Sequence, residues 1–138
     1  MPSKAEIVEL LVREFPQSRI VVEEVGDRSA RVSYPVGPDH LRPGGTVSGP
    51  VLMSVADVAI YVALLGTVGL VPLAVTTSLN INFLRKPPAD NPIVGVCRLI
   101  KVGRILVTGE VALYSGRGED MVAHAVGTYS IPPKREKG

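Results

Sequence analysis

The feature that most constrains this chain is a long uncharged stretch that contains one acid. Between residues 43 and 84, Asp57 is the only side chain that carries a formal charge. An apolar run of about 20 residues can span a bilayer, but glycines and a proline interrupt this run after residue 65, and strand-like segments follow that need a surface to cover. A helix that is apolar on every side lies either in a membrane or in a protein core. We therefore predict a buried core helix over residues 50–65 and no membrane contact.

Length and charge limit the classes of protein to which the chain can belong. Its 138 residues are enough for one domain with its own core, and we predict a single domain over residues 1–138. The formal net charge of +2, the scattered basic residues and the few aromatic residues do not indicate a nucleic-acid partner. The tail over residues 132–138 is expected to be flexible.

The cysteine count and the N-terminus bear on the compartment. The single cysteine, Cys97, excludes an internal disulfide and a metal site of several cysteines. Its strand-like setting indicates a buried thiol. The first residues contain both acids and bases, unlike a secretory signal. We predict a cytoplasmic protein that needs no cofactor and no metal ion.

Hydrophobic periodicity predicts an α+β protein. Ser3 is a good cap for a short amphipathic helix within residues 1–18, and two short strands joined by a Gly-Asp turn follow. A loop rich in proline and glycine then leads to the apolar helix. The rest has the pattern of a meander of long strands, the first of which places Leu79 on one face and Thr76 on the other by simple alternation. One buried helix with so many strands predicts a curved antiparallel sheet wrapped around it.

The element order and the residues at the helix entry resemble one family. In acyl-CoA thioesterases of the phenylacetate-degradation type, which have the hotdog fold, a loop with His-Gly-Gly leads into the helix and an acid follows within it. The stretch "SGPVLMSVAD" is similar in frame, with Ser48 at the histidine, Gly49 and Pro50 at the glycines and Asp57 at the acid. The segments "LNINFLRKP" and "MVAHAVGTYSI" also resemble strands of that family, so the resemblance covers roughly residues 30–131.

The resemblance implies hydrolysis of an acyl-CoA thioester to the free acid and CoA, with Asp57 as general base or nucleophile and the Gly49 N–H as the donor to the thioester carbonyl. An N–H in the first turn of a helix has no intrahelical partner and lies at the positive end of the helix dipole. Such a donor stabilises a developing oxyanion. Eight residues along a helix separate the two groups by about 12 Å, so a single chain does not easily bring both to one substrate. We therefore predict a homodimer or homotetramer, with Gly49 of one subunit facing Asp57 of another.

Other residues have supporting roles in this interpretation. Ser48 departs from the family's histidine but can still donate a hydrogen bond, and Arg42 stands near an asparagine of some members that orients the water or the acid. Arg42 can pair with Asp57 or with a substrate carboxylate. Related enzymes hold the attacking water with a hydroxyl near the start of the next strand, where Thr76 and Thr77 fall. We also expect substrate contacts from two further side chains, Tyr61 in the tunnel for the acyl chain and Arg85 at the CoA phosphates.

Two other functions stay open on the sequence. A hotdog hydratase or dehydratase would use His40 and Asp57 as an acid–base pair, because "HLRPGGTVSGPVLMSVAD" resembles the His…Pro-Gly-Val-Leu…Glu stretch of those enzymes. A non-catalytic acyl-CoA binding module would keep the fold and the tunnel without turnover. The residues expected to line the tunnel admit either an aromatic or a medium aliphatic acyl group.

Overall fold

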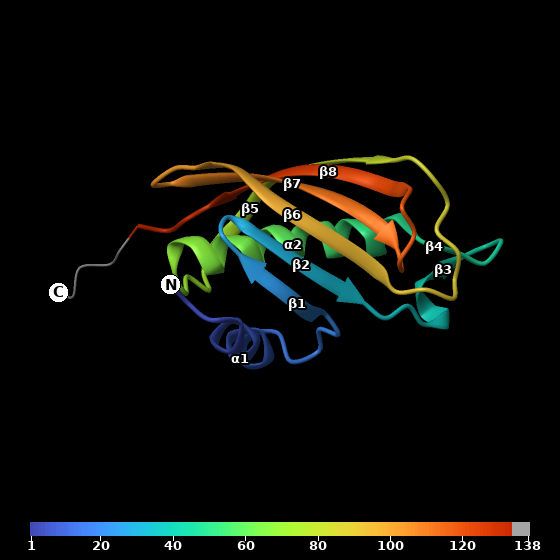
Figure 1. Cartoon of the computed structure of the whole chain (residues 1–138), viewed down its shortest axis with the longest axis horizontal. Helices are drawn as coiled ribbons and strands as arrows, with labels where there is room; N and C mark the ends of the chain where they lie inside the picture. The colour runs from blue at the N-terminus through green and yellow to red at the C-terminus, as the bar shows by residue number, and fades with distance from the viewer. Residues whose placement is uncertain (134–138) are drawn as a thin grey trace.

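One curved antiparallel sheet wraps around one long helix in the computed structural model of the protein, which describes residues 1–133. Figure 1 shows the strands arching over α2 (Gly49–Val68), with α1 (Lys4–Glu14) below it in this view. The strands are β1 (Val21–Gly26), β2 (Ser29–Tyr34), β3 (Leu41–Arg42), β4 (Thr46–Val47), β5 (Val75–Phe83), β6 (Ile93–Val102), β7 (Leu106–Ser115) and β8 (Met121–Ser130). The predicted α+β class is confirmed, while most of the expected flexible tail lies outside the described residues.

The N-terminal helix begins as its sequence predicts. The Ser3 hydroxyl accepts a hydrogen bond from the Glu6 N–H at 3.2 Å, and the Glu6 carboxylate accepts one from the Ser3 N–H at 3.1 Å. This reciprocal pair satisfies two donors that a helix start leaves free. Three apolar side chains of α1 are buried and join the core, namely Ile7, Leu10 and Leu11.

The apolar stretch forms the core helix α2, which extends a few residues beyond the predicted range at its C-terminal end. It is long and apolar enough to cross a membrane, but 61% of its most apolar window is buried inside the protein. The sheet approaches it closely where it lacks side chains, because a Cβ at Gly127 would lie 2.7 Å from Ile60 Cδ1. The lack of charged side chains in α2, apart from Asp57, is therefore explained by burial in the protein core. Its buried residues are Leu52, Val55, Ala56, Ala59, Ile60, Tyr61, Val62, Ala63, Leu64 and Leu65.

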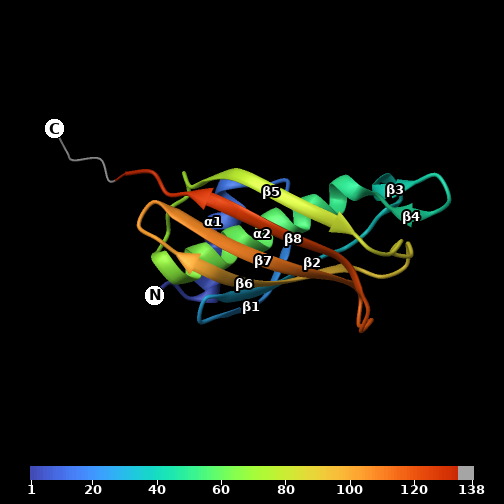
Figure 2. The ribbon, with the colours of Figure 1, turned by 90° about the horizontal axis from the view of Figure 1, so that it is seen from above.

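The strand order in the sheet differs from a simple meander. The six strands lie in the order β1-β2-β6-β7-β8-β5, so β5 pairs with β8 at one edge and not with β6, which follows it in the chain (Figure 2). A hairpin between β5 and β6, as the meander pattern predicts, is therefore wrong. A meander runs only through β6, β7 and β8. The consequence for the site is that the start of β5 lies beside the end of β8.

A β-bulge near the start of β5 changes which way its side chains point. Thr76 pairs with Tyr129 and Ser78 pairs with Thr128, so Thr77 is an extra residue between the two pairs. A bulge inserts one residue and interrupts the alternation of faces. The prediction that Thr76 and Leu79 lie on opposite faces is therefore wrong, since both are paired with β8 residues that face α2.

The edge strand β5 is open to solvent along most of its length. Seven of its nine residues are exposed, and the two terminal side chains, Val75 and Phe83, are 58% and 52% exposed. An open edge of this length presents unpaired backbone groups that another strand can bind. The opposite edge, β1, is shorter.

The single thiol lies in the core, as its strand setting predicts. Cys97 on β6 is fully buried. Burial raises the pKa of the Cys97 thiol to about 12, with a smaller contribution from the charge of Glu110. The thiol is therefore protonated at neutral pH, as expected for a structural cysteine.

Candidate active site

The lone acid of the apolar stretch is held by two hydroxyl groups from the sheet. Asp57 lies two turns into α2 and is partly buried. Its Oδ1 accepts a hydrogen bond from the Thr76 hydroxyl at 2.7 Å and another from the Tyr129 hydroxyl at 2.9 Å. Its other oxygen, Oδ2, accepts no hydrogen bond from the described residues. Within the described residues the carboxylate is thus held by hydrogen bonds to one of its two oxygens only.

Tyr129 is the site residue that the sequence analysis missed. Its hydroxyl also lies 3.2 Å from the carbonyl oxygen of Asp57, and the side chain is only 5% exposed. Burial, and then the negative charge of Asp57, raise the pKa of the Tyr129 phenol well above its usual value. The phenol is therefore a hydrogen-bond donor at any working pH. The signal in the sequence was a tyrosine at an inward position of a strand, because a buried tyrosine hydroxyl needs a partner.

An apolar pocket of about 440 Å³ adjoins the carboxylate. It lies between α2, the end of α1 and the connection from α2 to β5, and its volume is within the range of sites for small molecules, about 300–1,000 Å³. The predicted tunnel residue Tyr61 lines this pocket and donates a hydrogen bond to the carbonyl oxygen of Pro72 at 3.1 Å. The other lining residues are Leu11, Phe15, Ser18, Val58, Pro72, Leu73, Ala74, Val75, Thr76 and Tyr129.

Gly49, the predicted oxyanion donor, is the first residue of α2. Among the described residues its N–H has no hydrogen-bond acceptor. A Cβ at this position would lie 3.2 Å from Phe83 Cζ at the end of β5. Because Gly49 and Asp57 both lie in one regular helix, about 12 Å of helix separates them. Within one chain, the N–H and the carboxylate therefore do not converge.

The two residues that depart from the family pattern lie near the start of α2. Ser48 is the N-cap residue, its hydroxyl makes no capping hydrogen bond, and its N–H donates to the carbonyl oxygen of His40 at 2.8 Å. Arg42 is exposed in the short β3–β4 hairpin. None of the ion pairs among the described residues includes Arg42. Pairing of Arg42 with Asp57 is therefore not seen in the chain.

Two further residues that were predicted to contact the substrate, Thr77 and Arg85, do not bind the Asp57 carboxylate. The Thr77 hydroxyl donates to the carbonyl oxygen of Thr128 at 3.2 Å, so of the two adjacent threonines only Thr76 contacts Asp57. Arg85 is exposed, with one guanidinium nitrogen 4.0 Å from Asp120. Arg85 lies beyond the far end of β5 from Thr76, at the same end of that strand as Gly49.

His40, the partner that a hydratase would need, belongs to a separate cluster. Its Nδ1 accepts a hydrogen bond from the Gly37 N–H at 2.7 Å, and its Nε2 lies 3.0 Å from the Tyr34 hydroxyl. A neutral imidazole with this acceptor carries its proton on Nε2 and donates it to Tyr34. His40 lines a different pocket from that of Asp57. The chain therefore does not bring the two together as an acid–base pair.

No group of three or more histidine, cysteine or acidic side chains that suits a metal ion exists among residues 1–133. The groups that one chain brings together at this site are a carboxylate and two hydroxyl groups. These are the groups of acid–base and nucleophilic catalysis.

Comparison with known proteins agrees with the fold. The family model described as the thioesterase superfamily matches residues 44–122, more than half of the chain and the segment that contains Gly49, Asp57 and Thr76. No curated protein sequence is significantly similar to the chain.

Solved structures give the same assignment. A candidate thioesterase from a Silicibacter species is 38% identical, with a TM-score of 0.86 over 95% of this chain and 92% of that one. A mutant of the phenylacetic acid degradation protein PaaI from Thermus thermophilus is 25% identical, with a TM-score of 0.71 over 80% of this chain and 91% of that one. The PaaI protein of E. coli is 21% identical, with a TM-score of 0.73 over 91% of this chain and 90% of that one, and shares the fold.

A curved sheet around a central helix, together with these matches, defines a hotdog-fold protein. The chain belongs to the thioesterase superfamily. The family predicted from the helix-entry residues is confirmed.

Proposed function

We propose that the protein hydrolyses an acyl-CoA thioester to a carboxylic acid and CoA, with Asp57 as the reacting carboxylate. The observation that carries the proposal is the arrangement around that side chain. Two hydroxyl groups hold Oδ1, no described residue binds Oδ2, and an apolar pocket able to accept an acyl group lies beside them. A carboxylate in this state can take a proton from water or attack a carbonyl carbon.

The proposed reaction follows from these groups. With Asp57 as base, Oδ2 takes a proton from a water molecule while the water oxygen bonds to the thioester carbonyl carbon. Negative charge develops on the carbonyl oxygen, where a backbone N–H stabilises it. The C–S bond then breaks, and the CoA sulfur leaves with the proton that the carboxylate had taken. With Asp57 as nucleophile, Oδ2 itself bonds to that carbon, the C–S bond breaks, and CoA leaves as the thiolate. Water then hydrolyses the resulting anhydride to the free acid and the Asp57 carboxylate, and the proton released in this step goes to the CoA thiolate.

The backbone donor in this proposal is Gly49 of the partner subunit. The two groups are about 12 Å apart along α2, whereas both must lie within about 3 Å of one reacting carbonyl group or its water. Two observations support a homodimer: the Gly49 N–H has no acceptor among the described residues, and β5 leaves a long open sheet edge next to it. A two-fold pairing of β5 with its copy would create two equivalent sites. A homotetramer built from such dimers is compatible with the same site.

The cytoplasm is the compartment that we propose, since the only cysteine is a buried free thiol. Hydration or dehydration with His40 and Asp57 as a pair has no observation in its favour, because both ring nitrogens of His40 have partners of their own. Binding of acyl-CoA without turnover is distinguished from hydrolysis by measuring both.

The test is thiol release from a panel of short, medium and aromatic acyl-CoAs, with wild type and Asp57→Asn measured side by side. The substitution keeps size and shape but removes the base, so we expect a loss of turnover on the order of 10²–10⁴. His40→Ala is the control that separates hydrolysis from hydration, because a hydrolase that uses Asp57 retains thiol release without His40.

Folding is checked by melting temperature, and activity on enoyl-CoA substrates is measured in the same set. Activity that persists in Asp57→Asn would contradict the proposal. Tight binding of acyl-CoA by a wild type that releases no thiol would indicate a binding module.

A further inference from the structure

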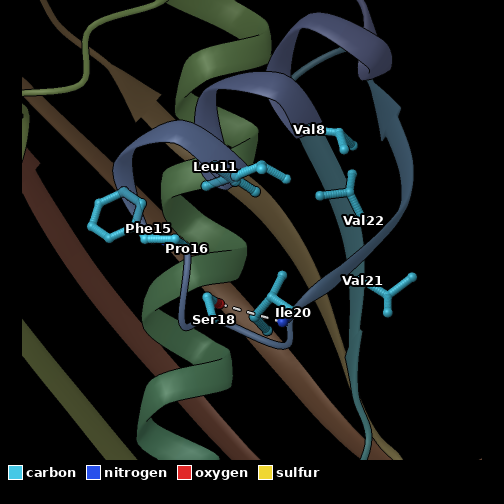
Figure 3. Close-up of a pocket in the computed structure, with 9 residues that line it drawn as sticks. Val8, Leu11, Phe15, Pro16, Ser18, Ile20, Val21 and Val22 are labelled. Carbon is cyan, nitrogen blue, oxygen red and sulfur yellow. Dashed lines mark hydrogen bonds between the residues drawn. The ribbon is translucent and has the colours of Figure 1, made fainter.

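A second apolar pocket borders the one that contains Asp57. It has a volume of about 320 Å³ and lies between α1 and β1, as Figure 3 shows. Nearly all of its lining is aliphatic or aromatic, from Val8, Leu11, Val12, Phe15, Pro16, Ile20, Val21 and Val22, with Ser18 as the one hydroxyl. The two pockets share Leu11, Phe15 and Ser18. These three residues are therefore the wall between them.

Phe15 is the part of this wall that is large and able to move. Leu11 is buried to 9% exposure, and Ser18 is small. Phe15 follows the last turn of α1, is 45% exposed, and contacts Tyr61 edge to face with ring centroids 5.8 Å apart. Tyr61 lines the pocket of Asp57. The Phe15 ring thus meets the proposed acyl pocket at its side remote from the sheet.

The segment that supplies the wall is separate from the segment that supplies the chemistry. The family model matches residues 44–122, which include α2 and β5, whereas α1 and the connector after it precede that range. The hydrogen bonds that hold Asp57 come from Thr76 and Tyr129, and Phe15 takes no part in them. A change at Phe15 can therefore alter the shape of the pocket and leave the carboxylate in place.

We propose that Phe15 ends the acyl-binding pocket, and so sets the longest straight aliphatic acyl chain that the protein accepts. The inference rests on the proposed thioester hydrolysis. The carbonyl end of the chain lies at Asp57, the chain runs past Tyr61, and its last carbons reach the Phe15 ring. Behind the ring, the pocket between α1 and β1 offers an apolar space that the wild-type chain does not enter.

The physical reason for a sharp limit is the value of each buried carbon. One buried methylene group increases affinity by about fourfold. Carbons that reach the Phe15 ring bury no further apolar surface, or they must push the ring aside, so they do not increase affinity. Removing the ring joins the two pockets, and a longer chain then buries additional methylene groups beneath α1.

The experiment measures kcat/KM for straight-chain saturated acyl-CoAs of increasing length with wild type, Phe15→Ala, Phe15→Leu and Val12→Ala. Val12 lines only the pocket between α1 and β1, so Val12→Ala is the matched control: it enlarges that pocket but leaves the wall intact. We expect Phe15→Ala to raise kcat/KM about tenfold or more for chains just beyond the wild-type optimum, from two or three newly buried methylene groups. Phe15→Leu shifts the profile less, and Val12→Ala follows wild type.

A second measurement tests the role of Phe15 in chain length independently of hydrolysis. Binding of S-alkyl-CoA thioethers, which cannot be hydrolysed, is measured by calorimetry with the same variants. If wild type releases no thiol but the preferred alkyl length increases in Phe15→Ala, the subsite stands and the hydrolysis is wrong. If Phe15→Ala changes kcat/KM and affinity equally at every length, or Val12→Ala shifts the profile as much, Phe15 does not set the length. If no thioether binds to any variant and no variant releases thiol from any acyl-CoA, both proposals are wrong.

Discussion

The two residues of α2 that we propose as reactive, Asp57 and Gly49, differ in how far the chain itself completes their surroundings. Asp57, in the middle of the helix, has its Oδ1 held by hydroxyl groups from two different strands and a pocket beside it. Gly49, at the start of the helix, presents an N–H that has no acceptor among the described residues, next to an exposed phenylalanine on an open sheet edge. One half of the proposed site is therefore complete within the monomer, whereas the other half has no partner group in the same chain. A rigid helix holds them apart, so a second subunit is the simplest way to join them.

Among changes that leave Asp57 in place, the largest expected effect comes from removing the Gly49 N–H. Gly49→Pro deletes the N–H, and Ser48 already has the extended backbone, with ψ of 153°, that a residue before proline requires. We expect kcat to fall on the order of 10²–10³, the usual cost of losing one oxyanion donor. The measurement is steady-state thiol release together with melting temperature.

Gly49→Ala is the control for this change. It keeps the N–H and adds a Cβ that would lie 3.2 Å from Phe83 Cζ, on an exposed ring that can move. A loss as large in Gly49→Ala as in Gly49→Pro would mean that space, and not the N–H, matters at this position.

Subunit mixing tests whether the two halves of one site come from different subunits. A hybrid dimer of one Asp57→Asn chain and one Gly49→Pro chain has one site with both wild-type groups if these come from different subunits. Two-fold symmetry then predicts about half of the wild-type activity per hybrid dimer, from two parents that are each nearly inactive. Hybrids are isolated by two affinity tags, and an inactive hybrid would show that the two groups act within one chain or not together.

A smaller effect is expected from the inward-facing half when one of its donors is removed. Tyr129→Phe deletes the hydroxyl that lies 2.9 Å from Asp57 Oδ1 but keeps the buried ring. A hydrogen bond to a charged group contributes about 1.5–3 kcal/mol, so kcat should fall on the order of 10–100-fold with little change in KM.

The matched control for Tyr129→Phe is Tyr61→Phe. Tyr61 lines the same pocket, but its hydroxyl binds the carbonyl oxygen of Pro72. We expect Tyr61→Phe to leave kcat near wild type. An equal decrease in both variants would assign the tyrosine hydroxyls to stability of the pocket and not to the carboxylate.

The smallest effect is expected at the exposed donor. Thr76→Val removes the hydroxyl that lies 2.7 Å from Oδ1 and keeps a β-branched side chain suited to a strand. Because Thr76 is exposed, water can replace the lost donor, and we expect a decrease in kcat of only a few-fold. A decrease larger than that of Tyr129→Phe would reverse the assigned order of the two donors.

The local part of this structure could be predicted from the sequence. A single acid in an uncharged stretch indicated both the core helix and the candidate reacting residue. A charged side chain is costly to bury, so a buried segment keeps one only where it has a partner or a function. Ser3 followed by Glu6 predicted the start of α1. The motif around Gly49 and Asp57 indicated the family, which the comparisons confirm.

The non-local part could not be predicted, and it includes half of the contacts to the carboxylate. Tyr129 follows Asp57 by 72 residues, and only the pairing of β5 with β8 brings it to the helix. Thr76 was selected by its place in the chain, but simple alternation gave its direction relative to Leu79 wrongly. The β-bulge that turns it depends on how two strands align, and that alignment is fixed by packing across the sheet.

The buried position of Cys97 has a consequence for redox chemistry. A protein that releases CoA, as proposed, works beside a free thiol product that exchanges with accessible disulfides and sulfenic acids. Its own single thiol, that of Cys97, is fully buried in the sheet core and stays protonated, with a pKa of about 12. Thiolate is the form that attacks disulfides and is oxidised. The folded chain therefore offers CoA no sulfur with which to form a mixed disulfide, and repeated release of thiol leaves the protein covalently unchanged.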